Sequence, residues 1–345
     1  MSTKNLIQYF EDLEDLEKSQ DGKKISHIKN LSREQKRTSQ MDKITAPAII
    51  TEQQDAGQVF EFSYQASHHE RQWIIDSLGG FYQSHWFDDV LQLIKGGKEA
   101  SVYLCQGNDT THTSHLAAKV YRPRRFRNLR KDHLYREGRD DLDENGHIIT
   151  DDGMQHAIKK RTTYGRQLLH SSWIEHEVKT MQILRQAGAD VPHIFASGNN
   201  AILMTYVGEA EMAAPALNEI DLEPAEARQL FERVLANIEI MLAHDRVHGD
   251  LSAYNILYWD GEITLIDFPQ AISPRENRNA YPIFQRDVKR ICEYFAEQGV
   301  RSQPQTIAEG MWHKFRHPTT PDMDPHFLDP DSDEDIALWN RLKVT

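Results

Sequence analysis

The fold is decided by the stretch His248-Gly249-Asp250-Leu251-Ser252-Ala253-Tyr254-Asn255, which a hairpin-like segment joins to Ile266-Asp267-Phe268-Pro269-Gln270. Two short apolar runs lie between the quoted pieces and predict two strands joined by a tight turn. Asp250 and Asn255 precede the first strand, and Asp267 ends the second. Phosphoryl transfer needs this set, because one carboxylate orients the attacking oxygen while an amide and a second carboxylate hold Mg²⁺ on the nucleotide phosphates. The stretch therefore predicts a phosphoryl-transfer site.

An ordinary hairpin with polar residues in its loops is the alternative interpretation, since a His-x-Asp triplet by itself is common. The position of Asp267 argues against it. This aspartate follows the strand-like run Ile263-Thr264-Leu265-Ile266, so its carboxylate ends a segment that we expect to be buried. Because burial of an unpaired carboxylate is costly, a divalent cation is its natural partner. The joint spacing of Asp250, Asn255 and Asp267 favours a functional site.

A second group of strands is predicted upstream. Residues 90–94 and 101–105 read as strands on either side of Lys95-Gly96-Gly97-Lys98-Glu99-Ala100, and a third strand at 116–121 carries Lys119 among apolar neighbours. This order matches the small sheet that covers the nucleotide in kinases, where a lysine of the third strand contacts the α and β phosphates. The loop lacks the Gly-x-Gly-x-x-Gly pattern, and a surface lysine at a strand end is the alternative for Lys119.

The partner of Lys119 is predicted from helical geometry. Ser172-Trp173-Ile174-Glu175 has the form of a capping box, which predicts a helix that opens there and stops near Gly188. On a 3.6-residue period Glu177 lies in an apolar stripe, whereas Glu175 lies mainly on the surface. A carboxylate in such a stripe needs a buried cation, so we expect an ion pair between Lys119 and Glu177, with Glu175 as the competing partner. The stripe contains Trp173, Ile174, Met181 and Leu184.

Taken together, these residues resemble the RIO family of atypical protein kinases. The resemblance covers about residues 85–300 and is carried by Gly97-Lys98-Glu99-Ala100-Ser101-Val102-Tyr103, Lys119, Glu177 and the two stretches 248–255 and 266–270. The phosphate loop and Leu251-Ser252 are similar to the first branch of the family, whereas 267–270 is similar to the second. We therefore assign no branch. The winged-helix domain that precedes the kinase domain in the second branch is not evident in the sequence.

The resemblance implies an α+β, two-lobed protein-kinase-like (RIO) fold, with a small antiparallel-sheet N-lobe and a mainly helical, reduced C-lobe without an activation loop. We expect the N-lobe at 61–207 and the C-lobe at 208–316. Residues 1–60 are expected to form a short helix and a polar linker, and 317–345 an acidic, proline-containing tail. Pro269, in place of the usual glycine, and Gly249, in place of the usual arginine, argue against regulation by a phosphorylated activation loop.

The resemblance also implies the roles of the site residues. Asp250 is the catalytic carboxylate, Lys119 holds the phosphates, Glu177 orients Lys119, and Asn255 and Asp267 bind Mg²⁺ or Mn²⁺. ATP is expected to contact the phosphate loop and the interlobe hinge through Gly97, Lys98, Glu99, Ala100, Ser101, Val102, Lys119, Met204, Tyr206 and Val207. The expected activity is serine phosphorylation, of the chain itself or of a protein, or ATP hydrolysis with transient phosphorylation of Asp267. Either activity would be linked to ribosome assembly.

Length and composition agree with one medium-sized enzyme core and tails. The chain has 345 residues, 39% of them hydrophobic, and two cysteines, Cys105 and Cys292, without metal-ligand spacing. Since neither a long apolar run nor a signal pattern is present, we expect a cytoplasmic protein that does not contact a membrane. The net charge of −13 argues against broad, non-specific binding of naked nucleic acid.

Basic residues are concentrated in a polar insertion from about 122 to 166, after the Lys119 strand. The resemblance identifies this insertion with the flexible loop of the RIO family. It is interpreted either as a solvated mobile loop or as a basic arm that reaches a phosphate-rich partner, such as ribosomal RNA in a ribosomal particle. Its cations include Arg122, Arg124, Arg125, Arg127, Arg130, Lys131, Arg136, Arg139, Lys159, Lys160, Arg161 and Arg166.

Three other functions remain open at this point. Small-molecule kinases of the aminoglycoside and choline type also carry His-Gly-Asp-Leu-x-x-x-Asn followed by Ile-Asp-Phe. The Gly-Lys-Glu-Ala loop, Tyr254 and the basic insertion favour the RIO interpretation over that one. The other two are a non-catalytic, nucleotide-gated scaffold and an RNA-binding module that retains the fold.

Overall fold

The computed structural model describes residues 60–97, 99–122, 135, 137–143, 145–198 and 200–318. The expected N-terminal helix and linker, the acidic tail beyond 318 and Lys98 therefore lie outside the described residues. These residues divide into two compact units, one made of 60–61 and 65–84 and the other of 62–64 and 85–318. Within the described ranges, no helix combines the length and the apolar character that crossing a bilayer requires.

The smaller unit consists of one helix and the chain that leads to it. Helix α2 (His68–Gln83) begins after Ser67, whose hydroxyl accepts a hydrogen bond from the Glu70 amide at 3.4 Å. Serine is favoured at this position because it satisfies an amide that has no partner within the helix. The rings of Phe60 and Tyr82 stack at a centroid distance of 4.6 Å and fix the two ends of the unit to each other.

The N-lobe of the larger unit is built on a five-stranded antiparallel sheet with the order β1-β2-β3-β5-β4. The strand-rich reading of 90–121 is confirmed, and Lys119 lies on the central strand, where it pairs with Val102 on one side and Ile202 on the other. Strand β3 is buried along almost its whole length, which agrees with its run of apolar residues. The strands are β1 (Asp89–Gly96), β2 (Ala100–Gln106), β3 (His115–Tyr121), β4 (Ile194–Gly198) and β5 (Ala201–Thr205).

Helix α5 (Thr163–Gln186) carries Glu177 and is longer than the sequence predicts. A start at Ser172 was wrong, because Thr162 caps the helix through a 3.0 Å bond from the Gly165 amide. The predicted loop also contains helix α4 (Asp152–Lys159), so a loop throughout 122–166 was wrong for this part. The two helices pack so closely that a Cβ on Gly165 would lie 1.9 Å from the Ala157 carbonyl oxygen. Ser172 is instead buried within α5, where its hydroxyl accepts a bond from the insertion.

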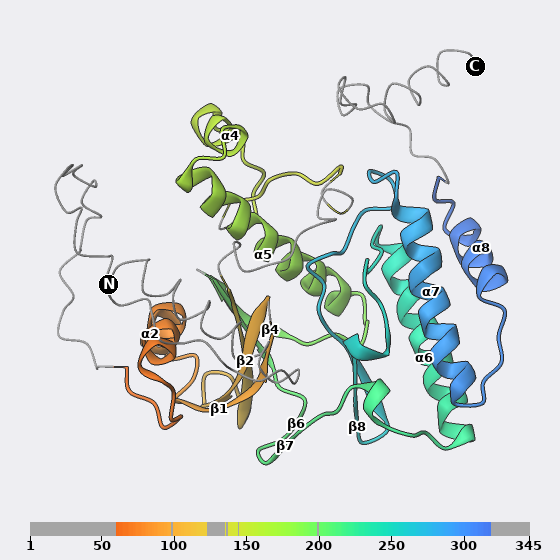
Figure 1. The fold of residues 1–345 in the computed structure, drawn as a ribbon, viewed down its shortest axis with the longest axis horizontal. Helices are drawn as coiled ribbons and strands as arrows, with labels where there is room; N and C mark the ends of the chain where they lie inside the picture. Colours follow the sequence, from red (N-terminus) through yellow and green to blue (C-terminus); the bar gives the residue numbers. More distant parts are fainter. Residues whose placement is uncertain are drawn as a thin grey trace, which may run out of the picture. The chain divides into compact units, whose positions relative to one another are not determined.

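The C-lobe is mainly helical and holds the predicted hairpin, in which Ile256 pairs with Leu265. Helices α6, α7 and α8 lie beside one another (Figure 1), with the Phe231 ring of α6 at 5.2 Å from Phe295 of α7 and the Trp312 ring of α8 at 5.3 Å from Phe284. The elements are β6 (Gly208–Glu209), β7 (Met212–Ala213), η2 (Leu217–Glu219), α6 (Pro224–Ala243), η3 (Ala253–Asn255), β8 (Ile256–Trp259), β9 (Glu262–Leu265), α7 (Ala280–Glu297) and α8 (Pro304–Lys314). The predicted two-lobed α+β kinase-like architecture is confirmed.

Candidate active site

Three of the predicted site residues meet at Lys119. Its ammonium nitrogen lies 2.7 Å from Glu177 Oε1 on α5 and 2.7 Å from Oδ1 of Asp267, the second residue after β9. Lys119 is 9% exposed and Glu177 is completely buried. Because these contacts join positions 58 and 148 residues apart in the chain, they exist only in the folded state. The structure thus brings together a strand lysine, a helix glutamate and the aspartate of the second quoted stretch.

The electrostatics around Lys119 favour its ammonium form and the carboxylate form of Asp267. Burial alone would lower the pKa of Lys119, but the carboxylates of Asp267 and Glu177 outweigh burial and raise this pKa. Burial would likewise raise the pKa of Asp267, and the neighbouring Lys119 ammonium lowers it instead. The Tyr121 hydroxyl, two residues after Lys119 on the same strand, donates a hydrogen bond to Glu177 Oε2. Both oxygens of the buried Glu177 carboxylate are therefore satisfied.

Glu175, the competing partner for Lys119, occupies a different environment. The expectation that it lies on the surface was wrong, since it is 8% exposed. Burial, followed by the charge of Asp143, raises the pKa of Glu175 to about 7. The reason is that the insertion covers this face of α5, since the Leu142 amide donates to Ser172 and Glu175 Oε2 lies near Gly146. Only Glu177 of the two forms the ion pair with Lys119.

The first quoted stretch forms a loop that is held from both sides. His248 is 2% exposed, and its Nε2 lies 3.1 Å from the Ile266 carbonyl oxygen while its Nδ1 accepts the Asp250 amide at 3.3 Å. On the other side, the Gly249 amide donates to Asp287 Oδ2 at 2.9 Å. The anchoring role predicted for His248 is confirmed.

Asp250 and Asn255 are linked within this loop. The Asn255 side-chain nitrogen donates to the Asp250 carbonyl oxygen at 2.9 Å, and the Asn255 carbonyl accepts the Ile266 amide at 3.0 Å. The second bond ties Asn255 to the residue that precedes Asp267. The Asp250 carboxylate points instead to α7, where its Oδ1 lies 2.7 Å from Arg290 Nη1.

The donor set fits a magnesium ion that is shared with a nucleotide. Asn255 and Asp267 supply an amide and a carboxylate, and the Asp267 side chain is 41% exposed. In the described part of the chain no cluster of three or more His, Cys, Asp or Glu residues forms a separate metal cage. Mg²⁺ is commonly bound in this way, by one or two carboxylates together with substrate phosphates.

Apart from Lys119 on β3, the predicted nucleotide contacts lie on β2, in the loop before it, and on β5 or just after it. The loop is tight, because the Gly97 amide donates to the Ala100 carbonyl at 2.9 Å, and Val102 sits opposite Lys119 in the sheet. Ser101 is buried, and Glu99 and Ala100 are half-buried. Met204 is 8% exposed and pairs with Ala117 of β3. After β5, the Val207 carbonyl accepts the Ala214 amide at 3.0 Å and the Tyr206 hydroxyl donates to Glu209 at 2.9 Å.

Comparison with known proteins agrees with this arrangement. A family model described as the RIO domain matches residues 101–307, which is more than half of the chain. The chain belongs to the RIO family. Strand β2 from Ser101 onward and the stretch with Asp250, Asn255 and Asp267 fall inside the matched segment.

Individual relatives of this RIO chain carry kinase names. It is 28% identical over 218 residues to the RIO-type serine/threonine-protein kinase Rio1 of Haloferax volcanii, which covers 63% of this chain and 66% of the relative. It is 27% identical over 217 residues to the serine/threonine-protein kinase rio1 of Schizosaccharomyces pombe, covering 61% and 39%. The human serine/threonine-protein kinase RIO3 is 28% identical over 131 residues, covering 37% and 25%. The matched part of the chain spans less than two thirds of each of these relatives.

Three residues of α7 that support this RIO site were missed by the sequence interpretation. Arg290 pairs with Asp250, Asp287 accepts the Gly249 amide, and Arg286 donates to the Gly249 carbonyl. Asp287 is 2% exposed. It lies in the apolar stripe of α7 with Phe284, Val288 and Ile291, which is the same signal that predicted Glu177. That signal was available for Asp287, whereas nothing local marks Arg290 as the partner of Asp250.

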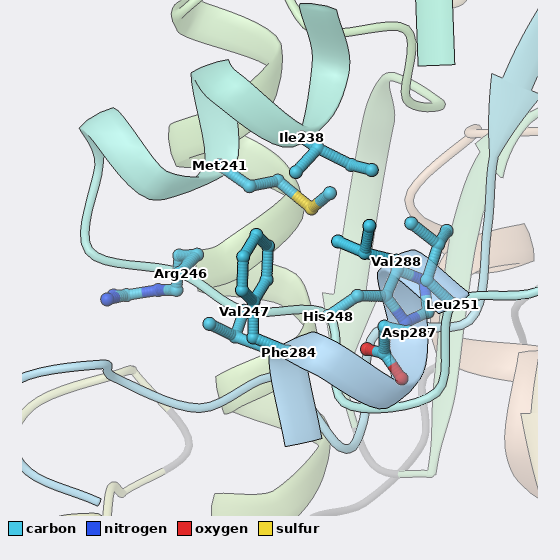
Figure 2. Close-up of a pocket in the computed structure, with 9 residues that line it drawn as sticks. All are labelled: Ile238, Met241, Arg246, Val247, His248, Leu251, Phe284, Asp287 and Val288. Atoms are coloured by element: carbon cyan, nitrogen blue, oxygen red, sulfur yellow. The ribbon is translucent and has the colours of Figure 1, made fainter. Parts of the chain in front are cut away.

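A small cavity lies behind the loop (Figure 2), between α6 and α7. None of the triad residues Lys119, Glu177 and Asp267 lines it, so it is a packing gap next to the site and not the nucleotide position. Burial raises the pKa of Asp287, while His248 and Arg286 act in the opposite direction. The lining residues are Ile238, Met241, Arg246, Val247, His248, Leu251, Phe284, Asp287 and Val288.

Proposed function

We propose that this chain is an ATP-dependent phosphotransferase of the RIO kinase type, which phosphorylates serine on itself or on a protein, or hydrolyses ATP. The observation that carries the proposal is the position of Lys119, at 2.7 Å from both Glu177 and Asp267. A lysine oriented by a helix glutamate and placed beside a metal-binding aspartate is the arrangement that protein kinases use for ATP phosphates. The kinase names of the relatives support the proposal.

In this proposal each side chain has one task. Lys119 binds the α and β phosphates, Glu177 keeps Lys119 in place, and the turn at 97–102 covers the phosphates. The adenine ring would meet the backbone near Tyr206 and Val207, with Met204 behind it. Asn255 and Asp267 would hold Mg²⁺ or Mn²⁺, which neutralises charge on the phosphoryl oxygens. Asp267 is also the residue that would take a phosphoryl group transiently during ATP hydrolysis.

We assign to Asp250 the role of accepting the proton of the attacking oxygen. Its carboxylate orients the serine hydroxyl, or a water molecule in ATP hydrolysis, and accepts the proton as the oxygen bonds to the transferred phosphorus. When serine or Asp267 accepts the phosphoryl group, the bond between that phosphorus and the bridging oxygen of ADP breaks, and ADP leaves with the electron pair. In ATP hydrolysis water then attacks the phosphorus on Asp267, and the Asp267 carboxylate leaves with the electron pair. Arg290, which holds Asp250 Oδ1 at 2.7 Å, limits the directions in which the carboxylate can point.

The test of this function is Asp250→Asn. We expect ATP affinity to remain within about threefold, because Asp250 does not touch the triad, and turnover to fall by about 10²-fold to 10⁴-fold. Asp260→Asn makes the same chemical change in the exposed β8–β9 turn and should leave turnover unchanged. Unchanged turnover in Asp250→Asn would remove Asp250 from its role.

The same assay separates the alternative functions. Phosphorylation of an aminoglycoside or choline, but of neither protein nor serine on the chain, would assign a small-molecule kinase. Nucleotide binding without hydrolysis or autophosphorylation in Mg²⁺ or Mn²⁺ would assign a scaffold. RNA binding that is indifferent to nucleotide and to Asp250→Asn would assign an RNA-binding module.

We also propose a cytoplasmic setting, from the sequence pattern, and a ribosomal partner, which the family resemblance alone supports. The basic insertion at about 122–166 would contact ribosomal RNA, and in its described part Lys159, Lys160, Arg161 and Arg166 are exposed. The division into an N-lobe at 61–207 and a C-lobe at 208–316, with 1–60 and 317–345 as flanking segments, belongs to the same proposal. A pull-down with Asp267→Ala that recovers no ribosomal particles would contradict the partner.

A further inference from the structure

A short segment of the insertion, residues 137–142, contacts both lobes of the larger unit; we name it the strap. On the C-lobe side, the Glu137 carbonyl accepts a bond from Asn277 Nδ2 at 3.1 Å, and its carboxylate lies 2.6 Å from Arg278 Nε. The backbone at Gly138 has φ +71°, and a Cβ there would lie 2.5 Å from the Glu276 carbonyl oxygen. The strap is thus closely packed against residues 276–278.

Arg139 of the strap reaches the turn that follows Asp267. Its guanidinium donates to the Pro269 carbonyl oxygen at 3.2 Å and, through its other terminal nitrogen, to the Ala271 carbonyl oxygen. A planar guanidinium binds two acceptors at once and fixes their relative position, which an ammonium group does less well. The second and fourth residues after Asp267 are therefore held by one side chain.

This restraint matters because Asp267 has an unfavourable backbone conformation. Its φ is +71°, in the left-handed region that non-glycine residues seldom adopt. Such a conformation persists only where the surrounding structure enforces it. On one side the Ile266 amide is bonded to Asn255, and on the other the Ala271 amide is bonded to Phe268 and the Ala271 carbonyl to Arg139.

The other end of the strap is attached to α5. The Leu142 amide donates to Ser172 Oγ at 2.9 Å, the Asp140 carbonyl oxygen lies 2.7 Å from His176 Nε2, and Leu142 is 2% exposed. His176 directly precedes Glu177. The contacts therefore form a closed circuit, from Asp267 through Lys119, Glu177 and α5 to the strap, and from Arg139 back to the turn after Asp267.

We propose that Arg139 is a positioning residue for Asp267, and that the strap couples the turn at 267–271 to helix α5. The proposal rests on the proposed function, in which Asp267 binds the metal of MgATP. In this proposal Arg139 bonds to the backbone of the turn and leaves nucleotide and metal to Lys119, Asn255 and Asp267. It acts by keeping the Asp267 backbone in its left-handed conformation, with the carboxylate beside Lys119.

The first experiment needs no nucleotide, so it tests whether Arg139 holds the turn at 267–271 independently of the proposed function. Amide hydrogen exchange is measured on the full chain and on Arg139→Ala. We expect exchange at Ala271, whose amide donates to the Phe268 carbonyl oxygen, to become about tenfold faster or more, because removal of charge-assisted hydrogen bonds increases local opening. Exchange at β8 (Ile256–Trp259) should stay within about twofold, which separates local opening from general destabilisation. Lys159→Ala removes a charge from the exposed part of the insertion and should change neither region.

The second experiment tests the positioning of Asp267. Affinity for a fluorescent, non-hydrolysable ATP analogue is measured as Mg²⁺ is titrated. In Arg139→Ala we expect the half-saturating Mg²⁺ concentration to rise by about fivefold or more while affinity without Mg²⁺ stays within about twofold. Unchanged exchange at Ala271, or faster exchange with an unchanged Mg²⁺ requirement, would overturn the proposal.

A conservative variant keeps the proposal testable if Arg139→Ala does not fold. Arg139→Lys retains the charge but reaches one carbonyl instead of two, so both effects should be present at about one third of their size. Wild-type exchange and Mg²⁺ dependence in Arg139→Lys would overturn the proposal. A wild-type chain that binds no nucleotide would refute the proposed function, while the exchange comparison still decides whether Arg139 holds the turn.

Discussion

Glu175 and Glu177 lie two residues apart on α5, and the replacement of Glu175 by glutamine tests the account of their environments. Glu175 is 8% exposed, and in the described part of the chain no ion pair offsets its burial. Burial and the charge of Asp143 raise its pKa from 4.5 to about 7. This difference means that ionisation of Glu175 lowers the stability of the fold by roughly 3 kcal/mol, since each tenfold change in proton affinity is about 1.4 kcal/mol.

The direction in which stability changes with pH follows from proton linkage. A folded-state pKa above the unfolded value means that the folded chain binds more protons, so the stability contribution is complete below about pH 4.5 and is lost as the pH rises to about 7. Glutamine cannot ionise and carries no such loss. We therefore expect the free energy of unfolding of Glu175→Gln, relative to wild type, to increase by about 2 kcal/mol between pH 5.5 and pH 8.

The assay is urea unfolding followed by tryptophan fluorescence at the two pH values. Subtracting wild type from variant at each pH removes the contribution of every other titrating group. The matched control is Glu70→Gln on α2, whose carboxylate is half-exposed. A relative stability that changes by less than about 0.5 kcal/mol between the two pH values would refute the reasoning.

Three further predictions concern the site itself. Glu177→Gln should cost about 2–4 kcal/mol of unfolding free energy at pH 7, because the buried Lys119 loses one of its two carboxylates; urea unfolding measures this, and a cost below 1 kcal/mol would contradict it. Gly249→Ala should cost at least about 2 kcal/mol of unfolding free energy, since its φ is +85° and a Cβ would lie 2.2 Å from the Gln270 carbonyl oxygen. Gly261→Ala, with φ +80° and open space around it, should cost about 1 kcal/mol, and equal costs would refute the close approach at Gly249. Arg290→Met should lower kcat by about tenfold to a hundredfold with little change in the KM for ATP, and should lower the free energy of unfolding by less than about 1 kcal/mol because the pair with Asp250 is partly exposed. Lys289→Met is the control, and an unchanged kcat in Arg290→Met would show that Arg290 does not position Asp250.

Much of the site was predictable from sequence because its signals are local. The spacing of Asp250 and Asn255 and the strand before Asp267 are read within twenty residues, and the predicted hairpin is present, with Ile256 opposite Leu265. Glu177 was predicted because a charge in an apolar helical stripe must find a partner. In each case the sequence of a single element predicts both its conformation and the chemistry of its exposed or buried face.

The start of α5 and the environment of Glu175 could not be read in this way. A capping box at Ser172 is a valid local signal, but Thr162 provides a competing cap and the packing of α4 against Gly165 stabilises the longer helix. Glu175 faces outward from the stripe that holds Glu177, and becomes buried only because residues of the insertion fold over it. A tertiary contact overrides local propensity where the contact contributes more free energy.

The sequence by itself thus determined the fold class, the family resemblance and the five side chains at 119, 177, 250, 255 and 267. The tertiary structure alone decided which groups hold those side chains: Arg290 on Asp250, Tyr121 on Glu177, and Arg139 on the turn after Asp267. The physical reason is separation along the chain, since Arg139 and Pro269 are 130 residues apart. Such contacts depend on how whole elements pack, and no periodicity within either element encodes the other.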